Sequence, residues 1–302
     1  MSLLNRPSDG FHSNLVVIYK LLLLEKKLSR EKIKSLCSPP TAIDSNYLGD
    51  TIKSLNRWTQ LGLFVESDGE VSINPIVPKK DLRIERLPSV ARGFVLKSEN
   101  NDKLFDKEGS LSADFTRMQA WSLTQDVWEY DQTSDVEVNL RLNKQTKDNS
   151  IFQQNDTRWS GFKAWSQFLG FAWTPPFPKA KIEPDPTEAI RDVLHDAFNE
   201  EDTLDALSLI KRLSEYLPVL DGGRYRRMVE DLLGESEGEY SWRPLPVGQL
   251  STSLSRALIR LREDGTLHFE DRDDSEHRLS LTGRGRIVLA TVTHISFKGG
   301  IS

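Results

Sequence analysis

Five side chains suited to contacts with DNA lie in two helix-forming segments. They are Lys53, Asn56 and Arg57 in the segment that begins at about Ser45, and Arg256 and Arg260 in the segment Ser251–Asp264. Lysine and arginine neutralise phosphates and release bound counterions, while asparagine and arginine donate hydrogen bonds to base edges in the major groove. We therefore predict that these five residues contact DNA. The alternative is a helix face that contacts protein or only solvent.

Two other patterns match enzyme sites only in part. Gly234–Gly238 fits the G-x-S-x-G nucleophile pattern, but it follows a helical stretch and its serine lies between two glutamates, which favours an acidic loop. Asp131, Glu137 and Lys144 lie within an apparent strand pair around Val136–Leu142, without the spacing of a metal-dependent nuclease. We expect a solvated strand face there.

Patterns typical of a nucleotide hydrolase or a metal site are missing from the sequence. No phosphate-binding loop of the form G-x-x-x-x-G-K-S/T occurs, and the five histidines fall outside any metal-binding spacing. The single cysteine, Cys37, cannot form a disulfide within the chain, and we expect a small buried side chain rather than a nucleophile. We predict a protein that is not an enzyme and uses no metal or other cofactor.

The segment Asp221–Arg227 has two interpretations. Its glycines could present backbone N–H groups to a phosphate, with three arginines following. Alternatively, Asp221 caps a helix and the arginines pair with the acidic neighbours Glu230 and Asp231. The acidic surroundings favour the second interpretation, which is structural.

The elements expected around Lys53 have the order of a winged helix-turn-helix domain. Apolar spacing and capping residues indicate a buried helix over Phe11–Lys27, a second helix that begins after Ser29, and a third helix that ends at Gly62. Two apolar runs around Asp68-Gly69 then predict a β-hairpin. The third helix of such a domain enters the major groove. We place this domain at 1–97.

The C-terminal segment repeats this pattern. The helix Ser251–Asp264 precedes Gly265, and the alternating segments Thr266–Glu270 and His277–Leu281 predict a second hairpin with an acidic tip at Asp271–Glu276. A closing strand or helix is expected over Ile287–Ile295. We therefore predict a second winged-helix domain at 240–302.

The sequence between these ends is acidic and rich in aromatic residues. The net charge is +5 for 1–97, −12 for 98–239 and +2 for 240–302. Five of the seven tryptophans lie between Trp121 and Trp173, which predicts either a core or an interface over 98–175. After a proline-rich linker, three short amphipathic helices are expected within 176–239. The predicted fold class is mainly α, with an α+β character.

The composition excludes several classes of protein. The 302 residues are 37% hydrophobic and 28% charged with a net charge of −5, which is typical of a globular protein and not of a basic protein that coats DNA. The longest apolar stretch, Leu15–Leu24, is too short to span a bilayer and contains Lys20. The first residues lack the apolar core of a signal peptide. We expect a cytoplasmic protein with no membrane partner.

Short motifs in three parts of the chain resemble the bacterial DpdG family. They are the opening Met1–Gly10, the segment Leu220–Arg226, and Leu250–Leu258 with Asp273-Asp274 after it. That family belongs to gene clusters that place 7-deazaguanine derivatives into DNA and restrict unmodified phage DNA. The resemblance implies a role in antiviral defence by DNA modification and restriction, alongside helicase, ATPase and nuclease-like components. It assigns no catalytic residue.

Together these observations predict a non-enzymatic scaffold that binds double-stranded DNA through the third helices of two winged-helix domains. A helicase or ATPase of the same gene cluster would bind the acidic, tryptophan-rich middle. An alternative is an assembly subunit of the tandem winged-helix type, which binds an ATPase partner and not DNA; the net charge of −5 favours it. A transcription regulator is a weaker alternative, because a symmetric dimer on a palindrome needs only one such domain per chain.

Overall fold

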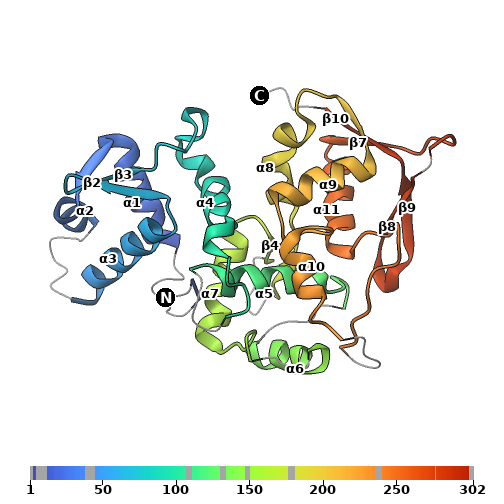
Figure 1. Cartoon of the computed structure of the whole chain (residues 1–302), viewed down its shortest axis with the longest axis horizontal. Coiled ribbons are helices and arrows are strands. Elements are labelled where there is room, and N and C mark those ends of the chain that lie inside the picture. The colour runs from blue at the N-terminus through green and yellow to red at the C-terminus, as the bar shows by residue number, and fades with distance from the viewer. Residues whose placement is uncertain are drawn as a thin grey trace. The chain divides into compact units, whose positions relative to one another are not determined.

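The computed structural model describes residues 3–4, 12–37, 45–106, 111–129, 134–146, 150–175, 181–234, 240–275 and 277–298. This part of the chain is mainly helical, with small sheets of antiparallel strands (Figure 1). The chain divides into two compact units: Met1–Phe115 with Asn155–Leu169, and Thr116–Gln154 with Gly170–Ser302. None of the described helices combines the length and apolar character that a membrane crossing requires.

The first unit begins with a compact arrangement of helices and a three-stranded sheet. Its elements are α1 (His12–Glu25), β1 (Lys27–Ser29), α2 (Arg30–Cys37), α3 (Ser45–Gln60), β2 (Phe64–Ser67), β3 (Glu70–Ile73), α4 (Leu87–Val95) and α7 (Asp156–Phe168), with 3-10 turns at Lys79–Asp81, Ile84–Arg86 and Ser98–Asn100. The sheet has the strand order β1-β3-β2, and Ser72 of β3 lies opposite both Lys27 and Val65. Helix α5 (Ala113–Thr124) begins in this unit and continues into the second.

Local signals in the sequence set the ends of these elements. The Ser29 hydroxyl accepts a hydrogen bond from the Lys32 backbone N–H at 3.3 Å, which begins α2 as predicted. Gly62 has a φ of +90° just after α3. Asp68 and Gly69 have φ values of 54° and 77°, the left-handed conformation that a two-residue hairpin turn requires.

Helix α7 completes the core of the first unit. The ring centroid of its Trp165 lies 5.4 Å from that of Trp58 on α3. Its Trp159 stacks on Phe162 at 5.4 Å, and Phe162 lies 5.8 Å from Phe115. Trp58, Trp159 and Trp165 are each at most 1% exposed. Part of the aromatic middle of the sequence is therefore core.

The second unit contains more elements. They are α6 (Asp135–Gln145), β4 (Ala172–Trp173), β5 (Glu183–Pro184), α8 (Thr187–Phe198), β6 (Thr203–Asp205), α9 (Ala206–Tyr216), α10 (Arg224–Glu230), α11 (Thr252–Glu263), β7 (Leu267–Glu270), β8 (Leu279–Thr282), β9 (Val288–Val292) and β10 (His294–Phe297), with a 3-10 turn at Arg284–Arg286. Helix α11 contacts α8, β7 and β8 (Figure 1).

The second unit repeats the topology of the first with two insertions. The elements α8, β6, α9, α11, β7 and β10 follow the order of α1, β1, α2, α3, β2 and β3, and the sheet order β6-β10-β7 matches β1-β3-β2. A segment with α10 is inserted between α9 and α11, and the β8–β9 hairpin is inserted between β7 and β10. In both repeats a glycine with positive φ follows the third helix, Gly62 in one and Gly265 in the other.

The predicted second hairpin is wrong in its pairing. The strand at 266–270 pairs with β10, where His268 lies opposite Ser296, and the strand at 277–281 pairs with β9, where Leu281 lies opposite Ala290. Alternating hydrophobicity shows which face of a strand is buried but does not identify its neighbour. The acidic stretch Asp271–Glu276 therefore joins two different sheets, and Glu276 itself lies outside the described residues.

The predicted strand over Val136–Leu142 is instead the helix α6. The side chains of Val138 and Leu142, four residues apart, are buried, whereas Val136 and Leu140 are 62% and 50% exposed. A short run of alternating apolar residues also contains the i, i+4 spacing of a helix, so the pattern alone does not decide. Ser134 caps the helix, because its side chain accepts a hydrogen bond from the Glu137 N–H at 3.3 Å.

Adjacent glycines before α10 should tolerate alanine unequally. A Cβ on Gly223 would lie 2.4 Å from the Pro218 carbonyl oxygen, which accepts hydrogen bonds from the Tyr225 and Arg226 N–H groups. A Cβ on Gly222 meets nothing within 4 Å, so Gly222→Ala costs only the left-handed φ of +73°, about 1–2 kcal/mol. We expect Gly223→Ala to lower the urea midpoint further than Gly222→Ala, and equal losses would contradict the close approach.

Tyr19 on α1 should make the protein less stable in alkali. Burial, together with the charge of Asp81, raises the pKa of Tyr19 to about 12 from its usual value of 10.0. The unfolded chain then ionises first, so ionisation favours unfolding, and the free energy of unfolding falls by about 1.4 kcal/mol between pH 9 and pH 11. Urea titrations at each pH should show that the free energy of unfolding of Tyr19→Phe falls by about 1.4 kcal/mol less over this pH range. Parallel slopes for the two proteins would contradict the assignment.

Candidate nucleic-acid interface

The exposed part of α3 is tied to α2 and β2 by a chain of polar contacts. Asn56 is exposed, and its side-chain oxygen accepts a hydrogen bond from Arg30 Nη1 at 2.6 Å. Arg30 also pairs with Glu66 of β2 at 2.7 Å, and its hydrogen bond lowers the pKa of that carboxyl. Lys53 pairs with Asp50 at 3.1 Å, and its side chain is 41% exposed. Lys53 and Asn56 thus lie on the surface of the first unit.

Arg57 does not lie on this surface, contrary to prediction. Its relative exposure is 3%, and Thr51 and Ser54 on the same helix are also buried. Helix α3 packs against α1 and α2 and, through Trp58, against Trp165 of α7. Packing against three helices buries a wider arc of α3 than one amphipathic stripe predicts.

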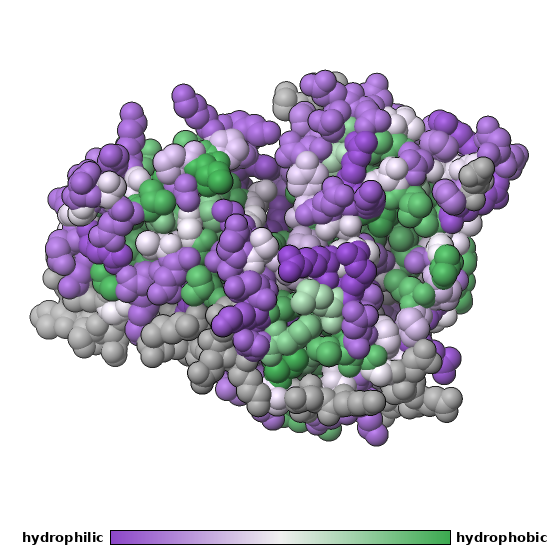
Figure 2. Space-filling view, viewed as in Figure 1, coloured by the Kyte–Doolittle hydropathy of each residue, from purple (hydrophilic) through white to green (hydrophobic). Residues whose placement is uncertain are grey.

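Exposed lysines that were not singled out by the sequence lie on and beside β1 and α2. They are Lys26, Lys27 and Lys32, and all three side chains are in the exposed class. The β2–β3 hairpin carries the opposite charge, because Glu66, Asp68 and Glu70 are exposed there. The face in Figure 2 is largely hydrophilic over the elements of the first unit. The run Lys26-Lys27 before a capped helix was the available signal for this basic surface.

Two arginines of α11, Arg256 and Arg260, are held in ion pairs. Arg256 lies 2.5 Å from Glu183 of β5, and its side chain is only 16% exposed. Arg260 pairs with Asp185, which follows β5 and is itself buried. These carboxylates neutralise the two arginines that a phosphate contact at α11 would need.

The two indoles beside these arginines complete a surface cluster of the second unit. The Arg256 guanidinium lies 5.8 Å from the ring centroid of Trp128, and that of Arg260 lies 6.0 Å from Trp173. Trp128 and Trp173 are 52% and 45% exposed, unlike Trp121, which is fully buried. The central tryptophans therefore divide between core and surface.

The start of α11 is buried in the second unit. The Ser253 hydroxyl donates to the Leu123 carbonyl at 2.8 Å, and the Thr252 hydroxyl accepts from the Val127 N–H at 3.0 Å. The Ser255 hydroxyl accepts from the Thr282 N–H at 2.8 Å. A helix whose first turn makes these contacts is a packing element of this unit.

The segment Asp221–Arg227 is a buried anchor for α11. The Asp221 carboxylate accepts hydrogen bonds from the N–H and the hydroxyl of Ser251, at 2.6 and 2.7 Å, and Ser251 caps α11. Arg226, 1% exposed, donates to Glu230 at 2.6 Å and lies 3.3 Å from Asp221. The predicted pairing with Glu230 is therefore present.

The predicted helix cap at Asp221 is wrong, because the N-cap of α10 is Gly223 and Asp221 bonds to Ser251 instead. The phosphate interpretation has little support from the backbone. The N–H of Gly223 donates to Leu220, and those of Tyr225 and Arg226 donate to Pro218, so these donors do not face a ligand.

The other candidate catalytic groups do not form a reaction centre in the described residues. Glu137 lies in the first turn of α6 and Lys144 in its last turn, while Asp131 and residues 235–238 lie outside the described residues. Burial raises the pKa of the Cys37 thiol, which disfavours the nucleophilic thiolate. No group of three or more metal-ligating side chains occurs in the described part of the chain.

Loss of the Asp185 carboxylate should destabilise the second unit. Besides Arg260, this buried group accepts hydrogen bonds from the N–H of Thr187 at 3.1 Å and from its hydroxyl at 2.5 Å, at the start of α8. We expect Asp185→Ala to lower the free energy of unfolding by about 1–3 kcal/mol. The matched Glu183→Gln changes a carboxylate whose side chain is 31% exposed, against 3% for Asp185, and should cost less than about 1 kcal/mol. Guanidinium titrations would contradict this ranking if Glu183→Gln cost more.

Comparison with known proteins gives one assignment. The family model described as DpdG-like matches residues 1–275, which include all of the first unit and most of the second. Comparisons with curated proteins and with solved structures found no match. The matched region agrees with the resemblance seen in the sequence and indicates involvement in a DNA modification system. The chain belongs to the DpdG-like family.

Proposed function

We propose that this protein is a non-enzymatic DNA-binding and scaffolding component of a system that modifies DNA and restricts phage DNA. The observation that carries the proposal is the duplicated order of three helices and closing strands, with the same strand order in both sheets. This is the element order of winged-helix domains, which place their third helix in the major groove of DNA. Membership of the DpdG-like family supports the same setting.

The first repeat is the better candidate for contact with DNA. Its third helix keeps Lys53 and Asn56 at the surface, and the exposed Lys26, Lys27 and Lys32 lie on and beside its second helix. In helix-turn-helix domains the last of these helices lies in the major groove, and the helix before it crosses the DNA backbone. The α3–β1–α2 surface, defined by these five residues, is our proposed contact.

The second repeat is the better candidate for a protein partner such as a helicase or ATPase of the same system. Its third helix carries Arg256 beside Trp128 and Arg260 beside Trp173, and both tryptophans are half-exposed. The charges of the two arginines are compensated by Glu183 and Asp185. Tryptophan and arginine are enriched at the centres of protein interfaces. A neutral surface of this composition suits a protein better than it suits a polyanion.

A second candidate function is an assembly subunit that binds an ATPase and not DNA. The observation that favours it is the acidic hairpin of the first repeat, because Glu66, Asp68 and Glu70 are exposed where other winged-helix proteins contact the DNA backbone. The net charge of −5 also opposes binding to a polyanion.

Salt-dependent DNA binding separates the two functions. We expect the intact protein to bind a labelled duplex in fluorescence anisotropy, and to lose affinity steeply between about 50 and 200 mM salt. Lys53→Glu and Lys27→Glu should each weaken binding and lower the salt slope by about 1, while Asn56→Ala should weaken it without changing the slope. Lys211→Glu, an exposed control on α9, should bind as the unchanged protein does.

Three outcomes would contradict the proposed contact. The first is no binding at the lowest salt, and the second is an equal loss in the Lys211→Glu control. The third is unchanged binding in a protein altered at Lys27, Lys53 and Asn56 together. Co-purification with an ATPase subunit in the absence of DNA, combined with the first outcome, would support the assembly subunit instead.

A further inference from the structure

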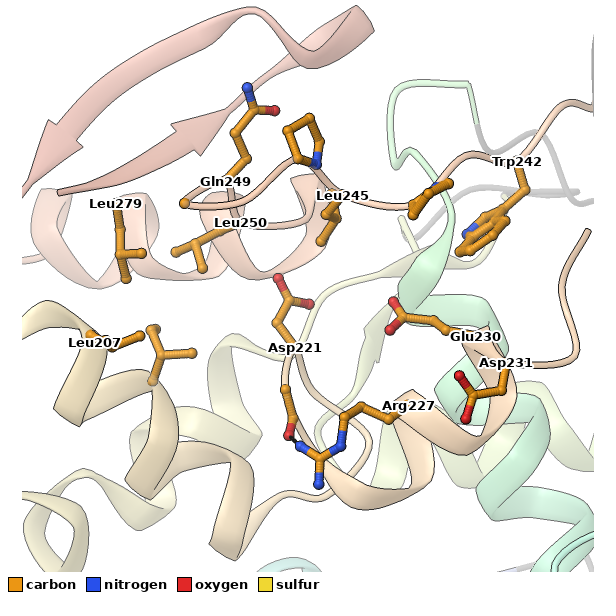
Figure 3. A pocket seen from close by; sticks show the side chains of 15 residues that line it. Leu207, Asp221, Arg227, Glu230, Asp231, Trp242, Leu245, Gln249, Leu250 and Leu279 are labelled. Carbon is orange, nitrogen blue, oxygen red and sulfur yellow. Dashed lines mark hydrogen bonds between the residues drawn. The ribbon is translucent and has the colours of Figure 1, made fainter. Parts of the chain in front are cut away.

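A pocket of about 520 Å³ opens in the second unit between α9, α10 and the segment 242–250 (Figure 3). This volume lies within the range of about 300–1,000 Å³ that small-molecule sites occupy. One side is apolar and is formed by Leu207, Ile210, Leu250 and Leu279. The pocket lies beside the buried Arg226 anchor but is not filled by it.

The other side of this pocket combines an indole with carboxylates. Figure 3 shows Trp242 above Glu230 and Asp231, with Asp221 closer to the apolar side chains. Asp221 is engaged by Ser251, and one oxygen of Glu230 accepts from Arg226 Nε at 2.6 Å. Asp231 is exposed at the rim. A flat aromatic ring could lie on the indole and donate N–H groups to the carboxylates of Glu230 and Asp231.

A second pocket, of about 340 Å³, has the opposite character and shares Trp242 with the first. Three arginines line it, Arg141, Arg243 and Arg286, together with Asp126 and Glu129. Asp126 already accepts hydrogen bonds from the N–H groups of Trp128 and Gly285, at 3.0 and 3.3 Å. The excess of guanidinium groups makes this pocket suited to an anion.

Two of these arginines are held in place before any ligand binds. Arg141 donates to the Glu129 carbonyl at 2.9 Å and lies 4.7 Å from the ring centroid of Tyr240. Arg286 donates to the carbonyls of Pro244 and Arg243, at 2.9 and 2.6 Å. These hydrogen bonds hold the loop segment that follows Trp242. Arg243 itself is exposed and also lines this pocket.

We propose that the two pockets form one site for a nucleoside monophosphate whose base carries an amino group. The base stacks on Trp242 with its amino edge toward Glu230 and Asp231, and the phosphate lies among Arg141, Arg243 and Arg286. A ligand that satisfies both pockets must be planar and hydrogen-bond-donating at one end and anionic at the other. The site goes beyond the proposed function, because it is independent of the α3–β1–α2 surface.

Matched ligand pairs test the base half of the site. Isothermal titration calorimetry of the intact protein would compare GMP with IMP and CMP with UMP, since the first member of each pair bears an exocyclic amino group that the second lacks. We expect GMP and CMP to bind about tenfold more tightly than IMP and UMP, because only their amino group adds a charge-assisted hydrogen bond to the carboxylates of Glu230 and Asp231. Asp231→Asn should reduce this preference, whereas Glu215→Gln, an exposed control on α9, should not.

The comparison of GMP with guanosine tests the phosphate half. Arg243→Ala should weaken GMP binding about tenfold and leave guanosine binding unchanged, while Arg284→Ala, an exposed neighbour that does not line the pocket, should change neither. Both Asp231 and Arg243 are exposed, so these variants should fold. Equal effects of Arg243→Ala on GMP and guanosine would overturn the placement of the phosphate.

A short single strand containing dG distinguishes a free nucleotide from a nucleotide within DNA. Binding of the strand but not of GMP, with loss in both Asp231→Asn and Arg243→Ala, would assign the site to a nucleotide of a DNA strand. The Lys53→Glu variant should bind GMP normally, so failure of the α3 contact and failure of this site are distinguishable. No binding of GMP, CMP or the strand at millimolar concentration would overturn the proposal.

Discussion

The buried guanidinium of Arg226 is the interaction on which the second unit depends. A charge that is 1% exposed needs compensation, and it obtains this from Glu230 on its own helix and from Asp221 on the preceding turn. Asp221 in turn receives two hydrogen bonds from Ser251, whose hydroxyl caps α11. Removing one partner of such a pair costs about 3–5 kcal/mol, because the other charge stays buried. The inserted segment that carries Asp221 and α10 therefore helps to hold the start of α11.

The two repeats share a topology but use their third helices differently. In the first, α3 packs on α1, α2 and α7 and leaves Lys53 and Asn56 at the surface. In the second, α11 is anchored at its start by Ser251 and along its length by ion pairs to Glu183 and Asp185. The same element order thus leaves two polar side chains of the third helix at the surface in the first repeat, whereas in the second repeat the arginines of that helix are paired with carboxylates.

Local signals made the ends of elements predictable, and long-range packing limited the rest. Ser29, Gly62, Gly265 and the Asp68-Gly69 turn act through their own backbone, so the sequence alone locates them. The contact of Trp58 with Trp165 joins residues far apart in the chain, and the ion pairs of Arg256 and Arg260 depend on carboxylates in and just after β5. The pairing of β7 depends on β10, a strand that comes later in the chain. Helix α6 shows that a short run of alternating apolar residues does not distinguish a helix from a strand.

The strand order of the second sheet has a consequence for how the chain folds. Strand β10, near the C-terminus, lies between β6 and β7, so Leu204 finds its neighbour Ile295 only after both insertions have been made. The first sheet joins residues between Lys27 and Ile73, which are close in sequence. Structures with local contacts form faster than those with distant ones. On a ribosome the first repeat can therefore assemble its sheet early, while the second must wait until β10 has emerged.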